Sequence, residues 1–367
     1  MGLLSDVFSG KNKKVLAWTL AGAAIFVPIN ITAKDSSVAK DKLQDKTEIV
    51  QKQDSLRILT DSVIAKFQDV QIKEAVARMM KTETGRIVLT ELTKKNIPVK
   101  ISSEIGSDLR GAYYPAAKKI LINSACSDDL IASILVHEGT HALQAANGCR
   151  LGPHLNAHSY INLNKAMEAD AMKNQLFASA ELKDLGDASV YKAFRREHPQ
   201  LVKSYESFRE KYGEQQDSIA KHTMLAYYND YSYVKEYEDR YVDALNAFYK
   251  AGKKNSGAGL FQMNISEAEI INRICHLNGR HYMNAADTVC LQDSARNYVL
   301  KSTYNSLEKL SSKHAKLLKD DPFLKQDTSY QKFHVVDYKG RVLQNPEKDT
   351  HKVIKNAYLR HHRLNRR

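Results

Sequence analysis

The sequence predicts a mostly helical α+β fold, with a small antiparallel hairpin or sheet placed just before a central helix. Three observations carry this prediction. Most of the chain has apolar residues at helical spacing, residues 109–123 hold two apolar runs around a proline, and residues 127–148 form one long apolar helix pattern. With 367 residues, of which 43% are apolar, the chain has room for a core in one large or two modest domains.

The N-terminus has the layout of an export signal. Residues 11–14 are basic, and the stretch from Val15 to Ala33 is uncharged and just long enough to span a membrane, which takes about 20 residues. Ala33 is small enough to end a cleavage site. We therefore expect residues 1–36 to be a signal peptide or an N-terminal membrane anchor. The remainder is then exported: periplasmic and held at the inner membrane through residues 15–33, or secreted.

The next elements are expected in chain order. Residues 37–81 form a helical spacer, and residues 86–95 form a further helix. Residues 97–102 form a strand, and residues 109–123 form the hairpin that leads directly into the central helix. A strand beside that helix is where an extended peptide can add as another strand.

The central helix has recognisable ends and an apolar body. Ser127 or Asp128 caps its start, where an acid also suits the positive end of the helix dipole. Asn147 and Gly148 supply a left-handed stop. Because apolar residues fill the turns before the polar motif at residues 137–141, we expect the helix to run through a core, where polar side chains need a partner to offset their desolvation.

The motif is His137-Glu138-Gly139-Thr140-His141. Residues four apart share a helix face, so the two histidines can present their nitrogens to one point, as a tetrahedral metal requires. Glu138 lies about 100° around the helix, too far for a ligand but well placed to take a proton from a water molecule on the metal. Gly139 costs a helix interior about 1 kcal/mol against Ala, which a purely structural helix has little reason to keep.

A third ligand is expected from the long helix predicted at residues 156–185. Glu168 and Asp170 point to different sides of that helix, so only one of them can face the metal. Small alanines around Glu168 let two helices approach closely, which favours Glu168 over Asp170. His154 and His158 are rivals, but a histidine in a loop is more often simply solvated.

The second half of the chain is also helical in pattern. Residues 190–250 are rich in tyrosine, and either one of these tyrosines or His222 is a candidate to donate a hydrogen bond to a developing oxyanion. After a flexible break, helices are expected at residues 266–277 and 293–318, followed by a small hairpin at residues 333–343.

The net charge and the cysteine count indicate which binding partners and which cellular compartment to expect. The net charge of +13 fits either a solvated surface or attraction to anionic lipid or an acidic polymer, and no nucleic-acid motif accompanies it. The four cysteines lack metal-knuckle spacing, and an even count after an export signal favours disulfides. Pairing neighbours along the chain gives Cys126–Cys149 and Cys275–Cys290, with four buried free thiols as the alternative.

The motif, the later acid and the order of hairpin and helix resemble the gluzincin type of zinc metallopeptidase, and a group of bacterial metallopeptidases of unassigned substrate. The resemblance covers roughly residues 85–185, and it implies a zincin-like core with His137, His141 and Glu168 as zinc ligands. Metzincins differ, because they need a third histidine where this chain has Asn147. Thermolysin-like enzymes place an acid four residues after the third ligand, where this chain has Met172.

Because Met172 cannot accept a hydrogen bond from a histidine ligand as an acid would, the groups that orient the metal ligands must be others. Gln144, Gln175 and backbone carbonyls are the candidates.

Together these features predict a zinc-dependent metalloendopeptidase-like hydrolase in which Glu138 is the general base. Residues 82–250 are expected to form the peptidase domain, and residues 251–367 a mostly helical C-terminal extension with a basic tail. The partner is a peptide or protein substrate. The alternative is a non-catalytic cell-envelope binding or assembly protein with a structural or vestigial zinc site.

Overall fold

The computed structural model describes residues 51–106, 109–252, 263–277, 279–317 and 327–344. The chain divides into two compact units, residues 1–57 and residues 58–367. In the first unit, the described residues 51–57 are helical. All elements named below lie in the second unit, which is mostly helical with small sheets and so confirms the predicted fold class.

After the helical residues 58–64, two short helices follow in the second unit. They are α2 (Val70–Met79) and α3 (Glu83–Lys94), and each begins at a polar residue whose side chain accepts a backbone N–H of the first turn. Asp69 provides this cap for α2 and Thr82 for α3. Both helices bury their apolar faces against the central helix.

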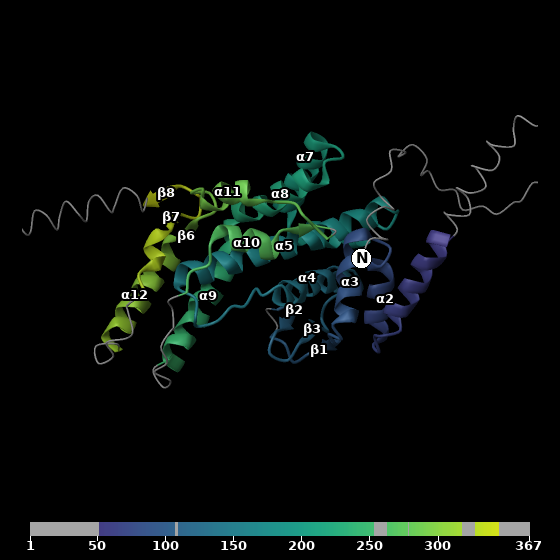
Figure 1. Cartoon of the computed structure of the whole chain (residues 1–367), viewed down its shortest axis with the longest axis horizontal. Coiled ribbons are helices and arrows are strands. Elements are labelled where there is room, and N and C mark those ends of the chain that lie inside the picture. The colour runs from purple at the N-terminus through teal and green to yellow at the C-terminus, as the bar shows by residue number, and fades with distance from the viewer. Residues whose placement is uncertain (1–50, 107–108, 253–262, 278, 318–326, 345–367) are drawn as a thin grey trace, which may run out of the picture. The chain divides into compact units, whose positions relative to one another are not determined.

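The predicted hairpin forms, and a third strand joins it. Strands β2 (Gly111–Tyr114) and β3 (Lys119–Asn123) pair antiparallel, while β1 (Val99–Ser102) pairs parallel with β3, which gives the order β1-β3-β2. The parallel pairing was not predicted, because it joins segments that are far apart in the chain. Strand β2 is therefore an edge strand, and it lies against the central helix (Figure 1).

Two long helices form the centre of this unit. The motif helix is α4 (Asp128–Ala146), capped by Ser127 and followed by Gly148 at φ +86°, as the sequence predicted. The second is α5 (Ala157–Asp184), capped by Asn156. The two helices pack against each other along most of their length, and α5 contributes residues to both hydrophobic cores of the unit.

Gly139 has a packing role that the sequence did not reveal. A Cβ atom at this position would lie 2.5 Å from Val88 Cγ1 and 3.0 Å from Leu92 Cδ1, both on α3. The glycine therefore lets α3 approach α4 closely. The helix keeps it for a structural reason, which corrects our interpretation of Gly139 as a sign of the metal site.

We expect Gly139→Ala to destabilise the protein by roughly 1–3 kcal/mol, the usual penalty for overpacking a core. The better helix propensity of Ala offsets only part of this penalty. Urea unfolding of the variant and of the wild type measures the difference. A variant as stable as the wild type would show that α3 can move away without loss.

The remaining helices and strands follow α5 in the chain, and the first of them, α6, packs against both α4 and α5. They are α6 (Ser189–Glu197), α7 (Pro199–Tyr212), α8 (Gln216–Ala226), η1 (Tyr227–Asn229), α9 (Tyr231–Gly252), α10 (Glu267–Ile274), β4 (His276–Leu277), β5 (Arg280–His281), η2 (Ala285–Asp287), α11 (Thr288–Gln292), β6 (Tyr298–Leu300), α12 (Lys301–Leu317), η3 (Ser329–Lys332), β7 (His334–Val336) and β8 (Val342–Gln344).

Two predicted helices in this region are shorter than expected. The helix expected at residues 266–277 ends at Ile274 and is followed by β4, which pairs with β5. The helix expected at residues 293–318 begins only at Lys301, because residues 298–300 form β6, which pairs parallel with β7 of the predicted hairpin. A short buried apolar run does not distinguish strand from helix by its periodicity.

The expected disulfides do not form, because all four cysteines are free. Cys126 and Cys149 flank α4, whose 19 residues span roughly 28 Å at the rise of an α-helix. A disulfide requires Cα atoms within about 7 Å of each other. Cys275 is buried with its sulfur 3.6 Å from that of Met283. The free thiols remove one argument for export, and the other concerns residues 1–36, which lie outside the described residues.

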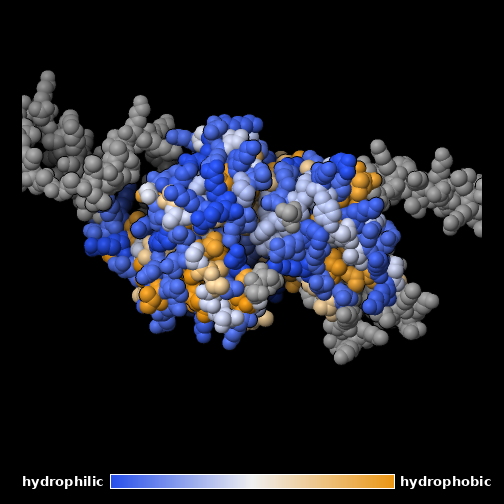
Figure 2. Space-filling model, turned by 180° about the vertical axis from the view of Figure 1, so that it is seen from behind, coloured by the Kyte–Doolittle hydropathy of each residue, from blue (hydrophilic) through white to orange (hydrophobic). Residues whose placement is uncertain are grey.

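The side drawn in Figure 2 is mostly hydrophilic, with apolar residues in small separate patches. Within the residues that the structure describes, no helix has both the length and the apolar character to cross a bilayer. The segment expected to contact a membrane, residues 15–33, lies outside them.

Candidate metal centre

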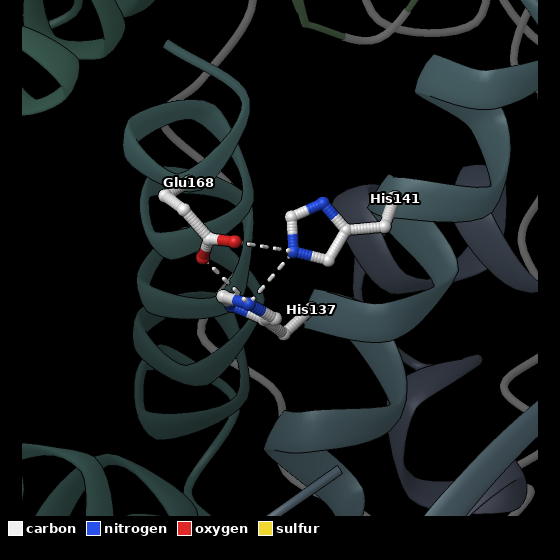
Figure 3. Close-up of side chains that lie close together, drawn as sticks. All are labelled: His137, His141 and Glu168. Carbon is white, nitrogen blue, oxygen red and sulfur yellow. Dashed lines mark hydrogen bonds and ion pairs between the residues drawn. The ribbon is translucent and has the colours of Figure 1, made fainter. Parts of the chain in front are cut away.

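Three side chains from α4 and α5 converge on one point. His137 Nε2 and His141 Nε2 lie 3.1 Å apart (Figure 3). His137 Nε2 lies 3.4 Å from Glu168 Oε2, and His141 Nε2 lies 3.4 Å from the other carboxylate oxygen, Oε1. The two histidines share one face of α4, as their spacing predicted, and α5 brings the glutamate opposite them. In the described part of the chain this is the one group of at least three such side chains whose ligand atoms lie close enough to hold a metal ion.

The spacing of these atoms fits a tetrahedral ion. A zinc ion bound at 2.0–2.1 Å has ligand atoms about 3.3 Å apart along the edges of its tetrahedron. Glu168 Oε2 is also buried without a hydrogen-bond partner among the described residues. A buried carboxylate oxygen beside two inward-facing imidazole nitrogens is a donor set that needs a cation. The residues present therefore fit zinc, although the structure does not identify the metal.

The charges of the three groups are strongly coupled. Burial alone raises the pKa of Glu168, but His141 and His137 pull that pKa well below its ordinary value. Burial alone lowers the pKa of His141, but Glu168 raises it to about 9. The carboxylate of Glu168 is thus held ionised, which is the form that binds a metal.

Glu138 follows His137 on α4, and β2 fixes the position of its side chain. The backbone N–H of Tyr113 donates to Glu138 Oε2 at 2.7 Å. Burial raises the pKa of Glu138, although His137 and His141 lower it in part. The close approach of β2 depends on Gly111, because a Cβ atom there would lie 2.6 Å from Ile134 Cγ2 and 3.0 Å from Glu138 Cγ.

The outer support of the triad comes from one of the predicted candidates. Gln144 Oε1 lies 2.9 Å from His141 Nδ1 and accepts a hydrogen bond from its N–H, which leaves Nε2 to face the metal point. Gln175 instead donates to Ser133 at 3.1 Å and does not reach the histidines. His137 Nδ1 is buried without a hydrogen-bond partner in the described chain.

The rival ligands lie elsewhere. Asp170 is on α5 two residues after Glu168, but its carboxylate accepts from Gln144 and Tyr282. His158 forms a hydrogen bond with Asn297, and neither His154 nor His158 belongs to the three-residue group.

A cavity of about 390 Å³ opens beside the triad and is lined by His137 of the triad and by Glu138. Of the tyrosine-rich segment, Tyr233 and Tyr237 line this cavity, and their hydroxyls lie 3.1 Å apart. Burial, followed by repulsion from Glu168, raises the pKa of Tyr237 well above its ordinary value, so its hydroxyl stays protonated. His222, the other predicted oxyanion donor, is bonded to Tyr212 and does not line the cavity.

His198 is a cavity residue that the sequence analysis missed. It ends α6, and its ring packs against Phe194 and Tyr233, with centroid distances of 4.8 and 5.1 Å. Burial and the nearby His137 lower the pKa of His198 to about 4, so the imidazole is neutral at pH 7. A lone histidine between two helices carries no motif, and only its place in the fold reveals it.

His198 is expected to make stability depend on pH. Its folded pKa of about 4 lies below the ordinary value of 6.5, so its contribution is complete above pH 6.5 and is lost as the pH falls through 4. Between pH 7 and pH 4.5 the wild type should lose on the order of 2 kcal/mol more than His198→Phe. Urea unfolding of both proteins at the two pH values measures this, and equal losses would contradict it.

The fold and the site together define a class of protein. Two histidines four residues apart on a buried helix, a glutamate from a second helix and a further glutamate beside a cavity are the parts of a metallopeptidase centre. The chain belongs to the putative metallopeptidase family DUF6782, whose profile matches residues 49–283. Comparisons with curated proteins and with solved structures gave no match.

Proposed function

We propose that this protein is a zinc-dependent peptidase that hydrolyses peptide bonds, with Glu138 as general base. The observation that carries the proposal is the convergence of His137, His141 and Glu168 on one point, with Glu138 lining the cavity that also reaches His137. The matched family supports the same class of reaction.

The ion and the protein have separate tasks in this proposal. When bound, zinc polarises a carbonyl as a Lewis acid and lowers the pKa of water to about 7. Glu138 takes the proton of the attacking water and passes it to the leaving nitrogen. Burial raises the pKa of Glu138 and so brings it closer to the range of a general base at neutral pH, while the Tyr113 N–H holds one carboxylate oxygen in place.

Donors for the developing oxyanion line the same cavity. His198, Tyr233 and Tyr237 each carry a hydrogen that their protonation state preserves at neutral pH. We propose that one of them stabilises the tetrahedral intermediate, because preorganised donors at this point account for a large part of catalysis in acyl transfer.

The edge strand β2 is the proposed binding site for the substrate backbone. Asn123 N donates to Arg110 O, so in an antiparallel ladder the backbone groups of Gly111 and Tyr113 face the open edge. Glu138 takes the N–H of Tyr113. The carbonyl of Tyr113 and both backbone groups of Gly111 are then positioned to pair with an extended peptide.

Gly111→Ala is expected to lower peptide hydrolysis by roughly 10²-fold while zinc stays bound, because the added methyl group displaces either β2 or the Glu138 side chain. Ala112→Ser adds similar bulk on the opposite face of the strand and serves as the control. The comparison of kcat/KM and zinc content in the two variants gives the result. Full activity in Gly111→Ala would show that this close approach is not needed for catalysis.

The proposed function is tested with the full-length, zinc-loaded protein and a library of quenched fluorescent peptides. We expect cleavage that stops when a chelator removes the metal and returns when zinc is added. Zinc binding without cleavage of any peptide or unfolded protein would overturn the proposal. That result would favour the alternative, a non-catalytic binding or assembly protein of the cell envelope.

A further inference from the structure

A buried chain of hydrogen bonds leads away from the metal point on the far side of His141. Gln144 lies next to that imidazole, and its Nε2 donates to Asp170 Oδ2 at 3.1 Å and to the Met167 carbonyl at 3.0 Å. The exposed fractions of Gln144 and Asp170 are both 2%, so water does not compete for these contacts. The chain therefore connects a proposed zinc ligand to an acid that is not a ligand.

The orientation of the Gln144 amide follows from its neighbours. A carboxylate and a backbone carbonyl can only accept, so the edge of Gln144 that faces Asp170 and Met167 must be its NH₂ group. Its carbonyl oxygen then faces His141 Nδ1 and requires a proton there. This fixes the imidazole tautomer whose Nε2 lone pair is available to a metal.

Asp170 is itself held from the other side by two donors. Tyr282 Oη donates to Asp170 Oδ1 at 2.8 Å, and Lys173 Nζ lies 2.8 Å from the same oxygen. Lys173 is fully buried, with its ammonium 4.0 Å from the centroid of the Tyr282 ring and 3.1 Å from the His276 carbonyl. His276 of β4 and Tyr282 are therefore connected to the metal site indirectly, through α5.

We propose that Asp170 is a positioning residue for the metal site, acting through Gln144 to keep His141 in its metal-binding tautomer. This inference rests on the proposed function only in taking His141 as a zinc ligand. Asp170 takes the place of the missing acid at Met172 by a different route, because it reaches the histidine through an amide. Tyr282 and Lys173 complete the unit by fixing the second oxygen of Asp170.

The proposal predicts the outcome of Asp170→Asn. Tyr282 and Lys173 both donate to Oδ1, so the new amide keeps its oxygen there and turns its NH₂ group toward Gln144. Gln144 then meets a donor at residue 170 and an acceptor at the Met167 carbonyl, so its orientation is no longer fixed. In the reversed orientation its NH₂ group faces His141 Nδ1, which favours the tautomer with its proton on Nε2. We expect the dissociation constant for Zn²⁺ to rise by roughly 10–100-fold.

Exchanging the acid and the amide provides the rescue. In the double variant Gln144→Glu with Asp170→Asn, the new carboxylate accepts from both His141 and the new amide, and the total charge is unchanged. Zinc affinity should return to the wild-type range. The full-length proteins are compared by competition for Zn²⁺ with a chromophoric chelator. Should the single variant fail to fold, the double variant still decides, because its contacts with His141 and with residue 170 are restored and only the donor to the Met167 carbonyl is lost.

Glu238→Gln is the matched control. Glu238 is another buried acid, and it forms an ion pair with Lys165 of α5. Among the described residues, it makes no hydrogen bond with those of the metal site. The Glu238→Gln substitution should lower the stability of the protein and leave its affinity for zinc unchanged. Equal weakening of zinc binding by Glu238→Gln and Asp170→Asn would overturn the proposal, as would wild-type affinity in Asp170→Asn or a double variant no tighter than the single one.

Failure of the proposed function gives a different result. If the wild-type protein binds no Zn²⁺, the proposed metal site is wrong. If the wild-type protein and Asp170→Asn bind Zn²⁺ equally tightly, only the proposed role of Asp170 is wrong.

Discussion

Glu138→Gln is expected to leave zinc bound and to lower kcat for peptide hydrolysis by roughly 10²–10⁴-fold, the usual contribution of a general base. The amide has almost the same size and still accepts the Tyr113 N–H through its oxygen, so the fold and the triad are preserved. It cannot take a proton from water. Single-turnover kinetics with a peptide substrate, combined with metal analysis of the same sample, separates loss of chemistry from loss of zinc.

His137→Ala is the companion variant for this prediction, because it should lose both the metal and the activity. A Glu138→Gln protein with undiminished hydrolysis would refute the role of Glu138. Loss of zinc in that variant would instead show that Glu138 supports the metal site.

Glu168→Ala is expected to weaken zinc binding by more than the 10–100-fold that follows loss of an outer partner, because it removes a direct ligand. The two imidazoles that remain cannot close a tetrahedral site. Hydrolysis should fall with zinc occupancy and recover in part at high zinc concentration. Titration with Zn²⁺ against a competing chelator measures the change.

Asp184→Ala is the control for Glu168→Ala. It removes another acid from α5, one that is half exposed and pairs with Arg209, and it should bind zinc as the wild type does. Unchanged zinc affinity in Glu168→Ala would mean that the carboxylate is not a ligand.

The motif helix and its partner were predictable because their signals are local. Ser127, Asn156 and Gly148 mark helix ends through their own chemistry, and the four-residue spacing of His137 and His141 places both on one face wherever that helix lies. Glu168 followed from helix geometry and from the small residues around it. The structure brings these three side chains together.

Features that depend on tertiary contacts were missed or misread. Gly139 was interpreted as a sign of the metal site, but its Cβ position is occupied by side chains of α3. The pairing of Cys126 with Cys149 ignored the length of the helix between them. His198 and Asp170 lie at positions that no local pattern marks, because their neighbours come from distant parts of the chain.

The central claim is that two histidines and one glutamate hold a zinc ion. Zinc K-edge X-ray absorption of the zinc-loaded, full-length protein tests it most directly. The account predicts a shell of nitrogen and oxygen atoms at about 2.0–2.1 Å with the scattering signature of two imidazoles. A shell that contains sulfur, or one without imidazole scattering, would contradict it.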